Sequence, residues 1–246
     1  MPDATTLFIA AVFVIAGLTK GVIGLGLPTI SMGLLALVMP PMQAAALLAL
    51  PSLVTNVWQM AAGPRLRTVT RRLWPMMAGV CAGTWAGMGL MTGTGVRYGT
   101  MLLGIALAIY ALSGLAAMRF TIPRAHEIWA GPLAGAVTGL ITAATGVFVI
   151  PAVPYLQAIG LEKEELVQAL GLSFTVSTAA LAVNLVMADA LDVGLAGPAL
   201  GALAMAALGM GLGQALRLRM SPPSFRRWFF SALLLLGLYL AVRGLA

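Results

Sequence analysis

The sequence predicts an all-α, polytopic membrane protein with two inverted repeats, each made of a broken or re-entrant helix pair and three transmembrane helices. Hydropathy, internal repetition and charge placement support this prediction. Hydrophobic residues make up 61% of the 246 residues and charged residues 9%, whereas about 25% of an ordinary soluble domain is charged. A soluble fold of this size cannot bury so many apolar side chains. These values exclude a water-soluble enzyme, a disordered chain and a secreted disulfide scaffold.

The apolar segments are too long and continuous for the alternating strands of a membrane barrel, so they are predicted to be helices. A helix needs about 20 residues to cross about 30 Å of hydrocarbon. Six segments reach this length easily: 43–62, 73–94, 98–118, 166–188, 193–216 and 228–245. The segments 6–25 and 128–145 are each followed by a shorter one, 28–39 and 147–159 respectively, which is too short to span alone.

Short motifs recur in the same order in the two halves of the chain, which predicts an internal duplication. The matching pairs are Gly17–Gly21 with Gly135–Gly139, Gln43 with Gln168, Ser52 with Ser177, and Pro75 with Pro198. We expect an N-terminal transmembrane repeat over 1–118, a cytoplasmic linker over 119–127 and a C-terminal repeat over 128–246.

Charge placement predicts that the repeats have opposite orientations. The loop after 43–62 carries Arg65, Arg67, Arg71 and Arg72, whereas its counterpart after 166–188 carries Asp189 and Asp192. At the following loop the first half has only Arg97, and the second half has Arg217, Arg219, Arg226 and Arg227. Basic loops face the cytoplasm, so equivalent loops are expected on opposite sides, unless the arginine placement is accidental. This places both termini outside the cell inner (plasma) membrane, with Arg119 and Arg124 of the linker inside.

The remaining composition limits the partners of the chain. The net charge of +7 comes from arginines beside apolar segments, so the predicted partner is the lipid bilayer and not nucleic acid. Trp74, Trp129 and Trp228 begin segments beside proposed cytoplasmic loops, as interfacial anchors do. The single Cys81 and single His126 are too few ligands for a protein-built zinc or iron site, so no cofactor or metal is expected.

The stretch from Gly17 to Pro28 predicts a helix that breaks inside the bilayer. Gly17, Gly21 and Gly24 lie on one helix face and allow another helix to approach closely. Gly24, Gly26 and Pro28 then interrupt the helix, and a short second helix is expected to begin near Pro28. The second half repeats this break at Thr142–Gly146. Two helix N-termini, at Pro28 and at Thr145–Gly146, would offer amide hydrogens to an anion; the alternative is that these glycines serve only packing.

Lys20 is the only charged residue well inside an apolar segment. An ammonium group at this depth costs at least about 2.5–3.5 kcal/mol, so it is normally paired or functional. Because no acid is placed to pair with it, a bound anion is expected to supply the counter-charge. The alternative is that Lys20 extends its amine to an interface.

Polar side chains form a stripe along each of two apolar segments. Ser52, Thr55, Asn56 and Gln59 share one helix face of segment 43–62, and Ser173, Ser177 and Asn184 form a sparser stripe in segment 166–188. Such stripes either hold helices together or line a substrate path. The amides of Asn56 and Gln59 can donate to sulfonate or carboxylate oxygens.

These motifs resemble the TauE/SafE family of sulfite and organosulfonate exporters. The resemblance rests on Gly17–Pro28, the short stretch Leu34–Pro41, the Ala-rich segment from Ala44 with Asn56 and Gln59, and the second copies Gly135–Pro151 and Gln168–Asn184. Many members have a run of glycines where this chain has Gly24-Leu-Gly26-Leu-Pro28. The resemblance implies transport of sulfur-containing anions, such as sulfite or sulfoacetate.

The function predicted from the sequence is secondary transport of a small anion by alternating access between inverted repeats. The candidate substrate-binding residues are Lys20, Gly24, Gly26, Pro28, Ser52, Asn56, Gln59, Thr142, Thr145, Gly146, Ser177 and Asn184. Another small organic anion, such as a carboxylate, and a non-transporting membrane scaffold are the alternatives. An intramembrane enzyme is disfavoured, because no membrane segment pairs a nucleophile with a base. A homodimer is left open as an assembly state.

Overall fold

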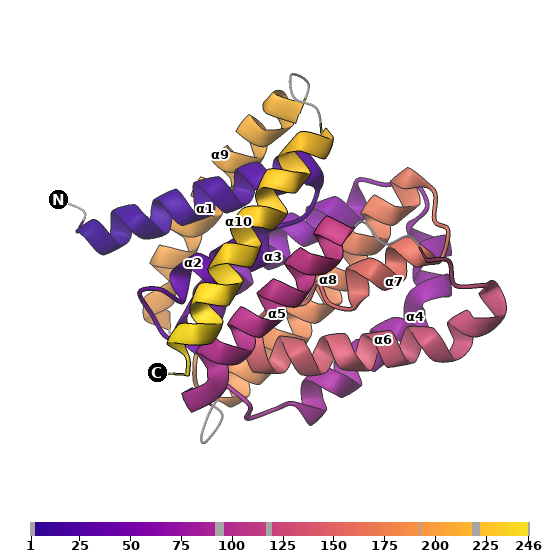
Figure 1. Ribbon diagram of the computed structural model, residues 1–246, viewed down its shortest axis with the longest axis horizontal. Helices are drawn as coiled ribbons and strands as arrows, with labels where there is room; N and C mark the ends of the chain where they lie inside the picture. The colour runs from indigo at the N-terminus through magenta and orange to yellow at the C-terminus, as the bar shows by residue number, and fades with distance from the viewer. Residues whose placement is uncertain (1–2, 92–95, 117–119, 192, 218–221, 246) are drawn as a thin grey trace.

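The computed structural model describes residues 3–91, 96–116, 120–191, 193–217 and 222–245. Within these ranges the chain forms ten α-helices, one short 3-10 helix and no strand (Figure 1). The all-α prediction is therefore confirmed. Arg119, Asp192 and Arg219, which entered the topology prediction, lie outside the described residues.

Each half of the chain contains the same order of elements: a long helix, a short helix and three further long helices. The first half contains α1 (Ala4–Ile23), α2 (Leu27–Leu35), α3 (Pro41–Ala61), α4 (Leu66–Ala86) and α5 (Val96–Ala116). The second half contains α6 (Arg124–Thr145), α7 (Ala152–Ala158), α8 (Lys163–Met187), the 3-10 helix η2 (Val193–Leu195), α9 (Ala196–Arg217) and α10 (Pro222–Arg243).

Seven described helices are long and apolar enough to cross a membrane: α1, α3, α5, α6, α8, α9 and α10. Five of them correspond to predicted spans. The predicted span 73–94 is not among the seven, because its helix α4 begins at Leu66 and includes Arg67, Arg71 and Arg72. The segments 28–39 and 147–159 form the short helices α2 and α7, with 9 and 7 residues.

The break predicted in the first half is confirmed by the backbone. Helix α1 ends at Ile23, and Gly24 follows in the left-handed conformation with φ of 75°, which glycine adopts without steric cost. Gly26 has φ of 109° and precedes α2, which has Pro28 in its first turn. In the second half, α6 ends at Thr145 and Gly146 has φ of 72°.

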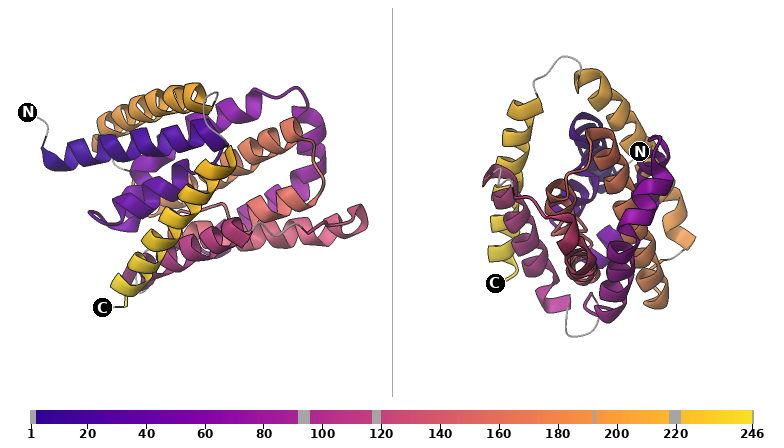
Figure 2. Two further views of the ribbon diagram at one scale, coloured as in Figure 1. Left: turned by 45° about the horizontal axis from the view of Figure 1, so that its top comes forward. Right: turned by 90° about the vertical axis from the view of Figure 1, so that its right-hand side faces the viewer.

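The long helices pack in pairs that join the two halves: α1 with α9, α4 with α6, α5 with α10 and α3 with α8. Figure 2 shows α1 and α9 running side by side. A Cβ atom on Gly17 would lie 2.2 Å from the Ala206 carbonyl oxygen, and one on Gly135 would lie 2.0 Å from that of Met76. These glycines therefore allow close helix packing, as predicted. Gly24 does not, because a Cβ there would meet nothing within 4 Å.

The helix bundle has two ends, which can be recognised from ion pairs and hydrogen bonds. At the first, the Arg65 end, Arg65 pairs with Glu162 and Glu165, and the α6 start lies beside the α7 end through a hydrogen bond from Ile122 to Ala158. At the opposite end, the Arg243 end, Arg243 donates to the Leu37 carbonyl. Helix α3 runs from the Arg243 end to the Arg65 end, and α8 runs in the reverse direction.

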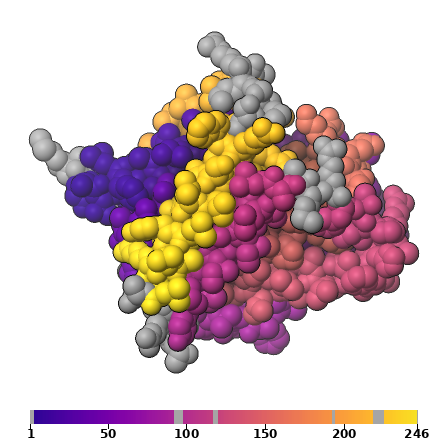
Figure 3. Space-filling view, viewed as in Figure 1, coloured from indigo at the N-terminus to yellow at the C-terminus, as the bar shows by residue number. Residues whose placement is uncertain are grey.

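The outer surface of the bundle is apolar. Helices α10 and α5, in yellow and magenta, run across the middle of the face seen in Figure 3. Their exposed side chains include Ile109 and Leu112 of α5 and Leu235 and Val242 of α10. Trp74, Trp129 and Trp228 are also exposed, as anchors at a lipid interface would be. Seven apolar helices with such surfaces identify a multi-pass membrane protein.

Candidate functional site

Lys20 lies inside the bundle, where α1 meets the C-terminal half of α3. Its side chain is buried, with 4% of the residue exposed. The Nζ atom donates to Thr55 Oγ1 over 3.1 Å and to Asn56 Oδ1. The alternative that Lys20 extends its amine to an interface is wrong, because the amine is buried and donates to two side chains of α3.

No ion pair involves Lys20 within the described part of the chain. The pairs recorded there are Arg65 with Glu162 and Glu165, and Arg72 with Glu127, all at the Arg65 end. The two oxygens that accept from Lys20 belong to a neutral hydroxyl and a neutral amide. The Lys20 amine therefore has no negative partner among the described residues.

Asn56 connects Lys20 to the contact between α3 and α8. Its Nδ2 atom donates to Ser52 Oγ over 3.0 Å and approaches Thr178 Oγ1 at 3.4 Å. Ser52 Oγ and Thr178 Oγ1 are themselves 3.2 Å apart. All three side chains are buried. One polar network therefore joins α1, α3 and α8 near the middle of the two longer helices. We call Lys20, Ser52, Thr55, Asn56 and Thr178 the central cluster.

Gln59 lies one turn beyond Asn56, toward the Arg65 end. Its Nε2 atom donates to the Val167 carbonyl over 3.1 Å and to that of Gly24 at 3.4 Å. Gln59 Oε1 is buried and has no hydrogen-bond partner. A single amide therefore holds the end of α1 and the first turns of α8 together, and leaves one acceptor atom unused.

The break between α1 and α2 lies beside this amide. Gly26 is packed tightly, since a Cβ there would come within 2.7 Å of Thr19 Cγ2, and its carbonyl accepts from Thr29 Oγ1 over 3.0 Å. Pro28 is buried in the first turn of α2. The structure thus places Gly26 and Pro28 at the start of a helix, as the sequence predicts, and it also places Gly24 next to Gln59.

The expectation of a second helix start at Thr145–Gly146 is wrong. Thr145 is the last residue of α6, Gly146 is its C-cap, and α7 begins only at Ala152. A helix C-terminus presents carbonyl oxygens, which do not attract an anion. The hydroxyls of Thr142 and Thr145 donate to carbonyls of their own helix, those of Thr138 and Ile141. Gly146 lies against Met32 and Ala45. Among the described residues, the side-chain hydrogen bonds of Thr142 and Thr145 stay within this segment and do not reach the central cluster.

Ser177 and Asn184 occupy different positions on α8. Ser177 precedes Thr178 of the central cluster and is fully buried, and its Oγ atom has no hydrogen-bond partner. Asn184 is about two turns nearer the Arg243 end, and its Nδ2 atom donates to the Thr84 carbonyl over 2.9 Å.

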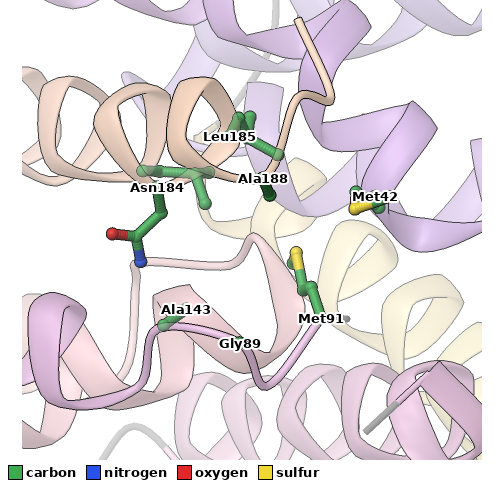
Figure 4. A pocket seen from close by; sticks show the side chains of 8 residues that line it. Met42, Gly89, Met91, Ala143, Asn184, Leu185 and Ala188 are labelled. Atoms are coloured by element: carbon green, nitrogen blue, oxygen red, sulfur yellow. The ribbon is translucent and has the colours of Figure 1, made fainter. Parts of the chain in front are cut away.

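A small pocket opens beside Asn184, at the Arg243 end of the bundle. It holds about 20 Å³ of water-accessible space, enough for about one water molecule. Figure 4 shows Asn184, Met91 and Met42 among the residues that line the pocket. Ala143 of α6 also lines the pocket, which places the α6 break on this side of the molecule.

The structure therefore places most of the predicted site residues in two groups. Direct contacts join the first group: Lys20, Gly24, Ser52, Asn56 and Gln59. The second group lies nearer the Arg243 end: Thr142, Thr145, Gly146 and Asn184. Gly26 and Pro28 stand at the start of α2, and Ser177 is next to Thr178 in α8. The sequence prediction omitted two members of the central cluster, Thr55 and Thr178. Thr55 lies on the predicted polar stripe, whereas Thr178 gives no signal, because its counterpart in the first half is the apolar Leu53.

Comparison with known proteins identifies the family. Residues 9–240 match the family described as "Sulfite exporter TauE/SafE", which covers nearly the whole chain. No curated protein and no solved structure matches the chain. The family is one of transporters and not of enzymes. This match agrees with the multi-pass fold and covers nearly the whole chain, and the chain therefore belongs to the TauE/SafE sulfite exporter family.

Proposed function

We propose that this protein is a secondary transporter that moves a small sulfur-containing anion, sulfite or an organosulfonate such as sulfoacetate, across the inner membrane. The observation that carries the proposal is the buried Lys20 amine, whose hydrogen-bond partners among the described residues are neutral oxygens. A small anion beside Lys20 would complete its charge balance, and hydroxyl and amide groups of the central cluster would bind its oxygens. Ser177 Oγ and Gln59 Oε1 are buried without partners, which favours a polar guest or water nearby.

Transport would proceed by alternating access between two inverted repeats. In support, α3 and α8 occupy equivalent places in the two halves and run in opposite directions between the Arg65 and Arg243 ends. The contact of α1 with α9 also corresponds to that of α6 with α4. The α1 break lies beside Gln59 and the α6 break beside Ala45, toward opposite ends of α3. Thr142, Thr145, Gly146 and Asn184 would line the path toward the Arg243 end.

The Arg65 end would face the cytoplasm, and both termini would lie outside. Arg65, Arg67, Arg71 and Arg72 gather at this end, as the positive-inside rule requires of a cytoplasmic surface. Figure 1 shows the N- and C-termini on the same side of the molecule.

The test is uptake of sulfite into liposomes that contain the purified protein. Lys20→Met should lower the transport rate about 10- to 100-fold, because it removes the charge that binds the anion. Lys163→Met is the matched control, since Lys163 is the other lysine of the chain and is exposed. Its transport should be unchanged.

Thermal unfolding with added ligands would identify the anion class. Sulfite, sulfoacetate and taurine would be compared with simple carboxylates, because any ligand of the native state raises the melting temperature. Stabilisation by carboxylates alone would shift the proposal to a carboxylate transporter. Failure of every anion to bind or move would favour a scaffold.

A further inference from the structure

We propose that Lys20 takes up a proton together with the anion and releases both on the far side of the membrane. The cargo would then be one anion and one proton per cycle. This inference rests on the proposed anion transport, and it adds the coupling ion that the function leaves open.

The surroundings of Lys20 contain acceptors and no fixed negative charge. Nζ donates to Thr55 Oγ1 and Asn56 Oδ1, and both acceptors serve a neutral amine as well as an ammonium group. Thr55 Oγ1 in turn donates to the Pro51 carbonyl over 2.8 Å. The hydrogen bonds of the site are therefore compatible with either protonation state of Lys20.

The helices around α1 add no acid to this environment within the described residues. Helices α2 and α3 carry no titratable side chain at all. The other titratable groups of helices packed around this site lie near helix ends or on the exposed surface: Arg217 of α9; Arg226, Arg227, Tyr239 and Arg243 of α10; and Lys163, Glu164 and Glu165 of α8. Glu165 is already paired with Arg65. No carboxylate in the described part of the chain therefore neutralises a proton on Lys20.

Under these conditions the proton and the anion stabilise each other. A buried ammonium without a counter-charge is unfavourable, and so is a buried anion without a cation. When both are present, each raises the affinity of the site for the other, and this linkage is reciprocal. The balanced step is the addition of one proton from water to the Nζ lone pair as the anion binds. The same N–H bond breaks when the anion leaves.

The experiment measures proton uptake during anion binding by the full-length protein in detergent. Titration calorimetry is performed with methanesulfonate and with sulfite, in two buffers that differ in ionisation enthalpy. Methanesulfonate matters because its sulfonate group stays ionised between about pH 6 and pH 9, so a proton taken up with it must bind the protein. We expect uptake of up to about one proton per anion, declining at the acidic end as Lys20 becomes charged before the anion binds.

Two variants separate this inference from anion binding itself. Lys20→Arg keeps a permanent charge, so it should bind the anion with no proton uptake. Lys163→Arg should behave like the unmodified protein. Anion binding without proton uptake by the unmodified protein would overturn the inference and leave the proposed function intact. Equal uptake in the Lys20→Arg variant would also overturn it, because the proton would then belong to another group. If neither anion binds, the proposed anion site itself fails.

Discussion

At the scale of single residues, the site depends on the contact between Lys20 and Asn56. Asn56 presents its oxygen to the lysine and its Nδ2 to Ser52, so one amide joins the cation to the hydroxyls. In the second half of the chain, the residue that corresponds to Asn56 when Ser52 is aligned with Ser177 is Leu181. The second half also has no lysine at its helix break. The lysine site is therefore found in the first half only.

Replacing Asn56 by aspartate tests whether Lys20 requires an external counter-charge. Asn56→Asp keeps the shape of the side chain and places a carboxylate against Nζ. This internal partner should lower sulfite affinity at least about tenfold, because it replaces the bound anion and repels it. Ligand-induced shifts of the melting temperature measure the change.

Asn56→Leu serves as the comparison, because it removes the amide and adds no charge. Its melting temperature without ligand should fall below that of Asn56→Asp, since Lys20 then keeps only Thr55 as a partner. Sulfite affinity that is equal in the two variants would contradict the charge-balance explanation.

At the scale of secondary-structure elements, close packing at a glycine fixes the position of α1, the helix that ends at the break. Helix α1 lies so close to α9 that the backbone of Ala206 occupies the space of a Gly17 side chain. Helix α9 also contains Gly201, where a Cβ would meet nothing within 4 Å. Because Lys20 is one turn beyond Gly17, the α1–α9 contact sets the depth of the lysine.

Gly17→Ala and Gly201→Ala each add one methyl group, with opposite expected effects. Gly17→Ala should lower the free energy of unfolding by about 1–3 kcal/mol through overpacking. Gly201→Ala should raise it by about 0.5–1 kcal/mol through helix propensity. Unfolding in mixed detergent measures both, and a stable Gly17→Ala protein would show that the contact can relax.

A second contact between elements joins the halves at the Arg65 end. Arg72 binds Glu127 through two hydrogen bonds, of 2.9 and 2.6 Å, and donates to the Ile159 carbonyl over 2.7 Å. Burial of both partners is substantial, with side-chain exposures of 22% and 14%. The hydrogen bond to Glu127 also raises the pKa of Arg72, so this cation stays charged at every physiological pH.

Arg72→Lys should lower the free energy of unfolding by about 1–2 kcal/mol, because lysine cannot make the bidentate contact and also reach Ile159. The neighbouring Arg71→Lys is the control, since Arg71 is exposed and its replacement should change stability little. Chemical denaturation measures the free energy of unfolding of both variants. Equal values would show that the Arg72 contact makes no net contribution to stability.

At the scale of the whole molecule, the proposed topology separates the two ends of the bundle by the membrane. Single cysteines would be introduced into a Cys81→Ser background and labelled in intact cells with an impermeant maleimide. Thr6→Cys lies near the N-terminus and Val38→Cys lies at the Arg243 end, and both should react from outside. Arg67→Cys and His126→Cys should react only after permeabilisation. The reverse pattern would invert the topology, and labelling of all four from one side would contradict the separation of the ends.

The sequence alone determined most of the elements and the break in the first half. Apolar segment lengths, glycines and prolines act locally, so most of the long helices, the short helices α2 and α7, and the end of α1 near Gly24 could be predicted. The absence of any acid deep in an apolar segment likewise singled out Lys20. The limits of local reasoning appeared at Thr145–Gly146, where the same glycine signal marks a helix end without an immediate helix start.

Only the tertiary structure decided which polar residues meet. Thr178 joins Ser52 and Asn56 because α3 and α8 pack in one register, and that register depends on contacts between distant residues, such as Gly171 against Met60. Asn184, although it lies on the same helix, is instead held by Thr84. Helical periodicity fixes the face on which a side chain lies, whereas non-local packing fixes the neighbour that this face meets.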